Sequence, residues 1–171
     1  MAKKAGRASG SGASGPSTAA TVALERAGIS YTPHVYVHDA ASSDFGAEAA
    51  RELGVDPSRV FKTLMIDTDQ GLGIGIVAVR DQLDVKALAG ELGAKKAAMA
   101  DKAVAERKSG YVVGGISPVG QKTRLPTVVD ETAFGFDTIF VSGGRRGFDI
   151  EIAPDDLLAA TAGRRASIRR S

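Results

Sequence analysis

The sequence of 171 residues contains no cysteine, no tryptophan and only two histidines, and these gaps exclude several kinds of site. Without cysteine there can be no disulfide, no thiolate zinc site and no cysteine nucleophile. Two histidines are too few for a multi-histidine metal site. We therefore expect no metal and no cofactor, and any acyl chemistry must proceed without a thiol from the protein.

Long apolar runs are missing as well. No stretch of about 18 apolar residues occurs, so the sequence predicts no membrane-spanning segment. The charged N-terminus is not followed by the apolar segment of a secretory signal. Together with the absence of cysteine, these features favour a cytoplasmic protein.

The basic residues are unevenly placed along the chain. Seven of them lie in the first 17 and the last nine residues, where there are no acidic residues: Lys3, Lys4, Arg7, Arg164, Arg165, Arg169 and Arg170. Without these seven, 15 basic residues face 20 acidic ones, so the pI near 9.0 is a property of the two ends. We expect both ends to be solvated tails, and any contact of the body with nucleic acid to be a local patch.

Length and composition predict one domain at residues 17–162, between a Gly/Ser/Ala-rich disordered tail at 1–16 and a basic tail at 163–171. Apolar patterning predicts strands at 31–38, 60–66, 72–79, 97–100, 111–113, 127–129, 138–142 and 148–152. Periodicity and capping residues predict helices at 18–27, 43–53, 84–92, 101–110 and 154–161. Because helices and hairpins are interspersed, we expect an α+β fold with a mixed sheet.

A glycine-rich stretch at 111–121 is the first candidate for a functional site. Gly114 and Gly115 follow three strand-forming residues, and Ser117 with Pro118 sets a turn. Backbone N–H groups at such a bend can approach a phosphate or a developing oxyanion closely. The alternative is an ordinary loop between two elements, which Gly-Gly pairs commonly mark.

Lys62 is the most informative single residue, because it lies between apolar neighbours in a predicted strand. Its ammonium either reaches solvent past the strand end or binds an anion or hydroxyl of a ligand. Tyr36 shares a strand face with His34 and His38, and the three rings either line a wall or form a half-exposed polar face.

Two further polar residues stand at strand positions. Ser142 ends a strand before two glycines, where it either meets a ligand or forms a turn. Asp149 lies in an otherwise apolar strand and requires a donor, for which Arg145 or Arg146 is the ordinary partner. Each of these signals is weak when taken alone.

Their order along the chain is informative. The segments concerned are 34–39 (His-Val-Tyr-Val-His-Asp), 45–50 (Phe-Gly-Ala-Glu-Ala-Ala), 60–64 (Val-Phe-Lys-Thr-Leu), 99–102 (Met-Ala-Asp-Lys), 110–122, 141–147 (Val-Ser-Gly-Gly-Arg-Arg-Gly) and 151–154 (Glu-Ile-Ala-Pro). In this order they resemble the YbaK/EbsC-type aminoacyl-tRNA editing domain, and within it the free-standing Cys-tRNA(Pro) deacylases. The resemblance covers residues 17–161.

The resemblance implies a compact mixed β-barrel wrapped by helices, and hydrolysis of the ester that joins a mischarged amino acid to tRNA. It implies that Lys62 anchors the terminal adenosine or its phosphate, and that Gly114 meets the ester carbonyl through its backbone. It places the remaining substrate-binding residues in the same pocket: Tyr36, Phe45, Thr63, Gly115, Ile116, Ser117, Ser142 and Asp149. In this family the thiol of the substrate cysteine is thought to attack the carbonyl and close a thiolactone.

The resemblance also implies two partners, the aminoacylated 3′ end of tRNA and prolyl-tRNA synthetase, and it extends to Cys-tRNA(Cys) as a substrate. Three alternatives remain open at this point. The fold could edit another amino acid, such as alanine on tRNA(Pro). It could be a non-catalytic RNA- or nucleotide-binding module, or a scaffold on prolyl-tRNA synthetase with a large exposed apolar patch.

Overall fold

The computed structural model describes residues 15–170, and the N-terminal tail predicted at 1–16 lies almost entirely outside them. The hairpin predicted around Asp69 is the centre of the larger sheet: β3 (Phe61–Thr68) pairs antiparallel with β4 (Gly71–Ala78). On the far side of β3 lies β5 (Ala97–Met99), antiparallel to it. On the far side of β4 follow β6 (Thr127–Asp130) and β9 (Arg164–Ala166), both parallel.

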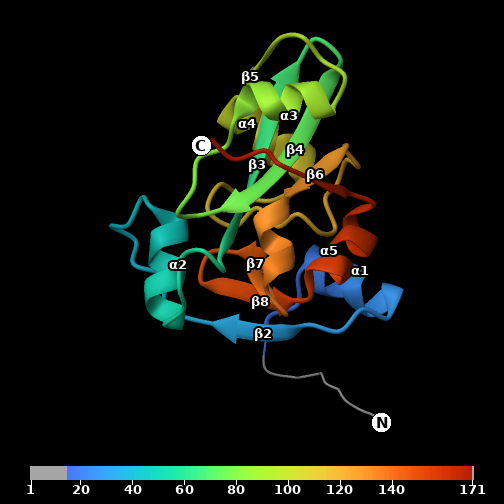
Figure 1. Cartoon of the computed structure of the whole chain (residues 1–171). Helices are drawn as coiled ribbons and strands as arrows, with labels where there is room; N and C mark the ends of the chain where they lie inside the picture. Colours follow the sequence, from blue (N-terminus) through green and yellow to red (C-terminus); the bar gives the residue numbers. More distant parts are fainter. Residues whose placement is uncertain (1–14, 171) are drawn as a thin grey trace.

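A smaller antiparallel sheet has the order β2-β8-β7. It consists of β2 (Thr32–Val35), β7 (Ile139–Arg145) and β8 (Phe148–Ile152). Figure 1 shows this sheet at one end of the molecule and the β3-β4 hairpin rising toward the other. The predicted mixed α+β fold is therefore confirmed, but it consists of two open sheets and not of a closed barrel.

Helices cover these sheets on several sides. They are α1 (Ala19–Ala27), α2 (Phe45–Leu53), α3 (Val85–Glu91), α4 (Lys102–Ser109), α5 (Pro154–Thr161) and the 3-10 helix η3 (Glu131–Gly135). Gly73 and Gly75 allow α3 to lie close on β4, because a Cβ at Gly75 would stand 2.7 Å from Leu88. No helix of the described residues is long and apolar enough to cross a membrane.

The apolar side chains form three buried clusters. The largest fills the space between the two sheets and includes Phe61 and Met65 of β3 together with Phe148 and Ile150 of β8. A second lies between the larger sheet and α3, and a third packs α2 against the outer face of the smaller sheet near Phe140. Alternate side chains of β3 thus point to opposite faces of the larger sheet, with α4 on one face and α3 on the other.

Three sequence-based expectations are wrong. Residues 111–113 form a bend and not a strand, because Tyr111 turns into the core and donates its hydroxyl to the Val119 carbonyl oxygen (2.6 Å). The strand predicted at 138–142 is longer at its end, because β7 continues through a bulge to Arg145.

The third concerns the C-terminal segment, which is an ordered part of the fold and not a solvated tail. Ile168 is fully buried, and its backbone N–H donates to the buried Asp130 carboxylate (2.9 Å). Arg169 lies 3.4 Å from the same carboxylate. In Figure 1 this segment crosses the molecule beside the larger sheet. Burial of Ile168 and its hydrogen bond to the Asp130 carboxylate therefore hold residues 163–170 on the fold, although most of these residues are polar.

Candidate active site

A cavity of about 460 Å³ opens beside the part of β3 that has no partner strand on its outer side. It lies between α2, the start of α4, the bend at 113–116 and the ends of β7 and β8. Eight of the ten predicted site residues line it: Tyr36, Phe45, Lys62, Thr63, Gly114, Ile116, Ser142 and Asp149. Residues separated by more than a hundred positions are thus brought to one wall.

Lys62 is half-buried in this wall, and burial lowers the pKa of its ammonium. The charges of Asp44 and Asp81 act in the opposite direction and raise that pKa. No carboxylate of the described residues lies within 4 Å of the ammonium. Its charge is therefore available to an anionic or hydroxyl-bearing ligand.

The glycine-rich bend is a turn closed by the Gly115 N–H, which donates to the Val112 carbonyl oxygen (2.8 Å). Gly114 occupies its third position with φ +91°, a conformation that favours glycine. The Val113 N–H donates to the Glu106 carboxylate (2.8 Å), whereas the Gly114 N–H has no acceptor among residues 15–170. The Gly114 N–H is therefore a donor at this bend that remains free for a carbonyl oxygen or an oxyanion.

Arg146 holds this bend against α2. Its Nε and Nη2 atoms donate to the Val113 carbonyl oxygen at 2.9 and 2.7 Å, and its guanidinium lies 4.9 Å from the centre of the Phe45 ring. A Cβ at Gly114 would stand 2.7 Å from that ring and 2.9 Å from Arg146 Nε. The bend, the ring and the guanidinium are packed so closely that only glycine fits.

Two predicted residues lie next to the cavity without lining it. A Cβ at Gly115 would stand 2.7 Å from the Arg145 Cα atom, so Gly115 allows the β7-β8 turn to pack against the bend. Ser117 is fully buried, and its Oγ accepts a hydrogen bond from the Val119 N–H (3.2 Å). Both residues support the bend, and neither faces the cavity.

Polar atoms without partners identify the part of the cavity built for a ligand. Thr63 Oγ1 is buried and has no hydrogen-bond partner among the described residues. Asp149 is 6% exposed, has no cation within 4 Å, and burial raises its pKa to about 7. The expected pairing with Arg145 or Arg146 is wrong, because Arg146 is bound to Val113. An unpaired buried hydroxyl and carboxyl are costly unless a ligand completes them.

Ser142 and Tyr36 contribute two further hydroxyl groups to this wall. Ser142 stands directly opposite Asp149 in the sheet, and its Oγ accepts from the Gly144 N–H (3.2 Å). Burial, followed by the nearby Asp149 charge, raises the pKa of the Tyr36 hydroxyl, which therefore stays protonated and can donate.

The two histidines do not line the cavity, although they share a pattern with Tyr36. His34 turns to Glu151, with 2.9 Å between Nε2 and Oε1, and His38 Nδ1 lies 2.7 Å from the buried Glu48 carboxylate. Of the three rings that could have lined one wall, Tyr36 alone lines the cavity. The wall consequently contains no histidine that could activate a serine. The described residues also contain no cluster of three or more possible metal ligands.

Sequence reasoning missed Asp44, Met99, Lys102 and Ala105, which also line the cavity. Asp44 caps α2 and Lys102 opens α4, so both stand at helix starts that face the cavity. The Met-Ala-Asp-Lys segment belongs to the pattern that suggested the family, which was the available signal for Met99 and Lys102. No sequence pattern indicated the contact of Arg146 with the bend.

Comparisons with known proteins identify the family to which this chain is similar. A model of the family described as the aminoacyl-tRNA editing domain matches residues 41–160. A protein of Enterococcus faecalis named "Putative Cys-tRNA(Pro)/Cys-tRNA(Cys) deacylase EbsC" is 38% identical over 120 residues, which are 70% of this chain and 73% of that protein. A "Proline--tRNA ligase" of Shouchella clausii is 31% identical over 159 residues, covering 86% of this chain but 27% of that longer protein.

Solved structures show the same likeness in the fold. A crystal structure described as "a putative trans-editing enzyme for prolyl tRNA synthetase" superposes with a TM-score of 0.77 and 25% identity, covering 91% of this chain and 99% of the other. A hypothetical protein gives a TM-score of 0.79 at 23% identity, with 90% and 100% covered, and shows the fold alone. The match of the family model over most of the chain, together with the 38% identical relative, shows that this chain belongs to the aminoacyl-tRNA editing domain family.

Proposed function

We propose that this protein is an aminoacyl-tRNA deacylase that removes cysteine wrongly attached to tRNA(Pro), with Cys-tRNA(Cys) as a second substrate. The family and the name of the 38% identical relative support this substrate class. The longer proline--tRNA ligase relative supports prolyl-tRNA synthetase as the partner beside which the protein acts.

The observation that carries the proposal is the composition of the cavity wall. It offers a cation at Lys62 and a free backbone donor at Gly114, but no cysteine or histidine. Such a wall can bind an aminoacyl ester and polarise its carbonyl, yet it supplies no Ser-His or Cys-His pair to attack that carbonyl. A substrate with its own nucleophile removes this difficulty.

Cysteine carries such a nucleophile three bonds from the ester carbonyl. The thiol sulfur attacks the carbonyl carbon, a C–S bond forms, and the negative charge on the carbonyl oxygen is stabilised by the Gly114 N–H. Removal of one donor of this kind costs roughly 3–4 kcal/mol of transition-state stabilisation in known enzymes. The C–O bond to the ribose then breaks, the ribose oxygen takes the proton lost by the thiol, and water opens the released thiolactone to free cysteine. The protein contributes orientation and polarisation.

The unpaired groups of the wall suit the rest of such a substrate. The buried Asp149 carboxylate gains a cationic partner in the α-ammonium of the amino acid, and Thr63 Oγ1 gains a hydrogen bond. Lys62 is then left for the terminal adenosine or its phosphate, to which an ammonium is a strong donor.

The scaffold alternative has less support. Large apolar side chains are exposed at five described positions, of which Val35 and Val37 lie two residues apart on the chain. Two such valines do not make an extended apolar patch of the size that marks a docking surface.

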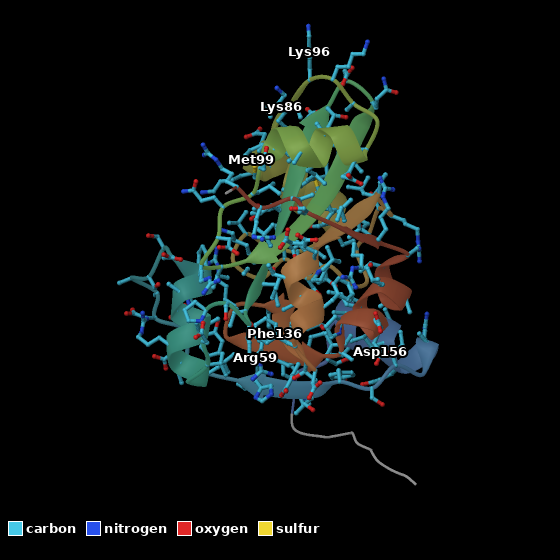
Figure 2. The ribbon with its side chains drawn as sticks, viewed as in Figure 1. Arg59, Lys86, Lys96, Met99, Phe136 and Asp156 are labelled. Atoms are coloured by element: carbon cyan, nitrogen blue, oxygen red, sulfur yellow. The ribbon has the colours of Figure 1, made fainter. Side chains whose placement is uncertain are left out.

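Deacylation of Cys-tRNA(Pro) by the wild type and by Lys62→Ala tests the proposal. We expect the substitution to lower kcat/KM by about 100-fold, because the ligand loses a charge-assisted bond in a half-buried site. Lys86→Ala is the control, since Lys86 is exposed on α3, does not line the cavity and lies toward one tip of the molecule (Figure 2). Wild-type protein that leaves Cys-tRNA(Pro) intact, or a Lys62→Ala variant as fast as the control, would contradict it.

A further inference from the structure

The residues 101–124 differ in charge from the rest of the described chain. They contain five basic side chains, Lys102, Arg107, Lys108, Lys122 and Arg124, against the two acidic residues Asp101 and Glu106. The other residues of 15–170 contain 14 basic and 18 acidic side chains. This segment therefore has a net charge of +3, whereas the other described residues together have a net charge of −4.

Backbone hydrogen bonds hold these cations together. The Lys122 N–H donates to the Ser109 carbonyl oxygen and the Thr123 N–H to the Lys108 carbonyl oxygen, each at 2.9 Å. The segment 121–124 thus lies against the C-terminal turn of α4. We call these five basic residues, on α4 and on the segment that returns beside its C-terminal turn, the α4 surface.

The α4 surface is continuous with the cavity. Lys102 and Ala105, in the first turns of α4, line the cavity wall. The Glu106 carboxylate binds the Val113 N–H at the glycine bend, which occupies one of the two acidic side chains of this segment. A ligand that leaves the cavity along α4 therefore meets mainly positive charge.

The cations of the α4 surface also have no partners within the protein. None of the five has a carboxylate within 4 Å among the described residues. Two of the four C-terminal arginines differ in this respect: Arg164 lies 3.6 Å from Glu91, and Arg169 lies 3.4 Å from Asp130 and Glu131. Unpaired cations bind phosphates without first breaking an internal ion pair.

We infer that the α4 surface binds the double-stranded acceptor arm of tRNA through its phosphates, while the 3′ end enters the cavity. The inference rests on the proposed function for the identity of the RNA. The eight residues of α4 span about 12 Å, and an RNA duplex presents several phosphates over that length. Contacts of this kind position the RNA without reading its sequence.

Binding of an RNA hairpin with the acceptor-arm sequence of tRNA(Pro) tests the inference. The variant carries Arg107→Gln, Lys122→Gln and Arg124→Gln, three exposed positions outside the cavity wall. We expect the variant to bind roughly tenfold more weakly, and the slope of log K against log salt to fall by up to about 3, because each of the three lost phosphate contacts lowers it by nearly 1.

The matched control replaces three exposed lysines elsewhere by glutamine: Lys86, Lys95 and Lys96. Lys86 lies on α3, which packs on the opposite face of the larger sheet from α4, and Figure 2 shows Lys86 and Lys96 toward one tip of the molecule. The control removes the same charge, so it should retain the affinity and the salt slope of the wild type.

Hydrolysis of a cysteinyl ester of adenosine, which has no acceptor arm, separates this inference from the proposed function. The α4 variant should hydrolyse the ester as fast as the wild type. If the wild type hydrolyses neither the ester nor Cys-tRNA(Pro), the proposed function fails, but hairpin binding still tests the surface. Unchanged hairpin binding by the α4 variant, or an equal loss in the lysine control, would overturn the inference.

Discussion

At the scale of single residues, the buried hydroxyl of Thr63 lowers the free energy of unfolding when no ligand is bound. Thr63 Oγ1 is buried in the cavity wall without a partner. We predict that Thr63→Val, which removes the hydroxyl and keeps the shape, stabilises the protein by about 1 kcal/mol. The same change should raise KM for Cys-tRNA(Pro) several-fold. Urea unfolding and steady-state kinetics measure the two effects, and a destabilised variant with unchanged KM would refute this role.

Asp149 is a second such residue, and its effect depends on pH. Burial raises its pKa from 3.8 to about 7, so the folded protein holds this proton more tightly than the unfolded chain. Asp149 does not lower the free energy of unfolding below about pH 4, where its carboxyl is protonated in both states. The free energy of unfolding falls as the pH rises from about 4 to about 7, and above about pH 7 it stays lower by up to about 4 kcal/mol.

We therefore predict that Asp149→Asn is more stable than the wild type at pH 8, and that this difference is about 2 kcal/mol smaller at pH 5. Guanidinium unfolding at both pH values checks this. The variant should also bind Cys-tRNA(Pro) more weakly, because it cannot pair with the α-ammonium. Wild type and variant curves that stay parallel from pH 5 to pH 8 would contradict the account.

Eight of the ten site residues predicted from the sequence lie in this wall, but their partners were not predicted. Lys62, Gly114 and Asp149 belong to a family pattern, so they could be named without coordinates. Ser117 belongs to the same pattern and points into the core, because the turn closed by the Gly115 N–H sets which groups face the cavity. Asp149 was given an arginine partner because Arg146 is near in sequence, whereas that guanidinium binds Val113.

At the scale of elements, the site depends on how three segments are held together. Arg146 in the β7-β8 turn binds the Val113 carbonyl oxygen at the bend and stacks on Phe45 at the start of α2. Glu48 of α2 accepts hydrogen bonds from His38 and from the Asp39 N–H, each at 2.7 Å. The contacts of Arg146 hold the bend, and those of Glu48 hold α2, so the two segments are fixed on either side of the cavity.

We predict that Arg146→Lys lowers kcat by about ten- to a hundredfold, because a misplaced bend moves the Gly114 donor away from the carbonyl. Lysine keeps the charge but cannot make the paired bonds of the guanidinium fork. Arg146 is exposed, so unfolding by denaturant should change by less than about 1 kcal/mol. An Arg145→Lys variant at the neighbouring exposed position is the control. Wild-type kcat in Arg146→Lys would show that the fork does not position the bend.

Elements with a strong local pattern could be predicted from sequence, and elements set by distant contacts could not. The β3-β4 hairpin follows from alternation and from its Asp-Gln-Gly turn. Residues 111–113 are as β-branched and aromatic as a strand, but the Tyr111 hydroxyl bonds to Val119 and the chain bends instead. Tertiary burial of one aromatic ring outweighs the local strand preference there.

At the scale of the whole molecule, net charge is a poor guide to where unpaired cations lie. The basic C-terminus was expected to be a free tail, yet two of its four arginines, Arg164 and Arg169, pair with Glu91, Asp130 and Glu131. The unpaired cations of α4 were hidden in an acidic body, because helices and returning segments concentrate charge in a way that composition does not reveal. Parallel pairing of β9 with β6 depends on a segment about 35 residues away, which local patterning does not detect.

The central claim is that the substrate supplies the nucleophile which the cavity lacks. Its most direct test is the rate at which the wild type deacylates the same tRNA(Pro) charged with cysteine, serine or alanine. We predict hydrolysis of the cysteinyl ester at a rate at least a hundredfold above the other two, since neither serine nor alanine carries a thiol. Equal rates for the alanyl and cysteinyl esters would show that a group of the protein, or a water molecule it activates, performs the attack.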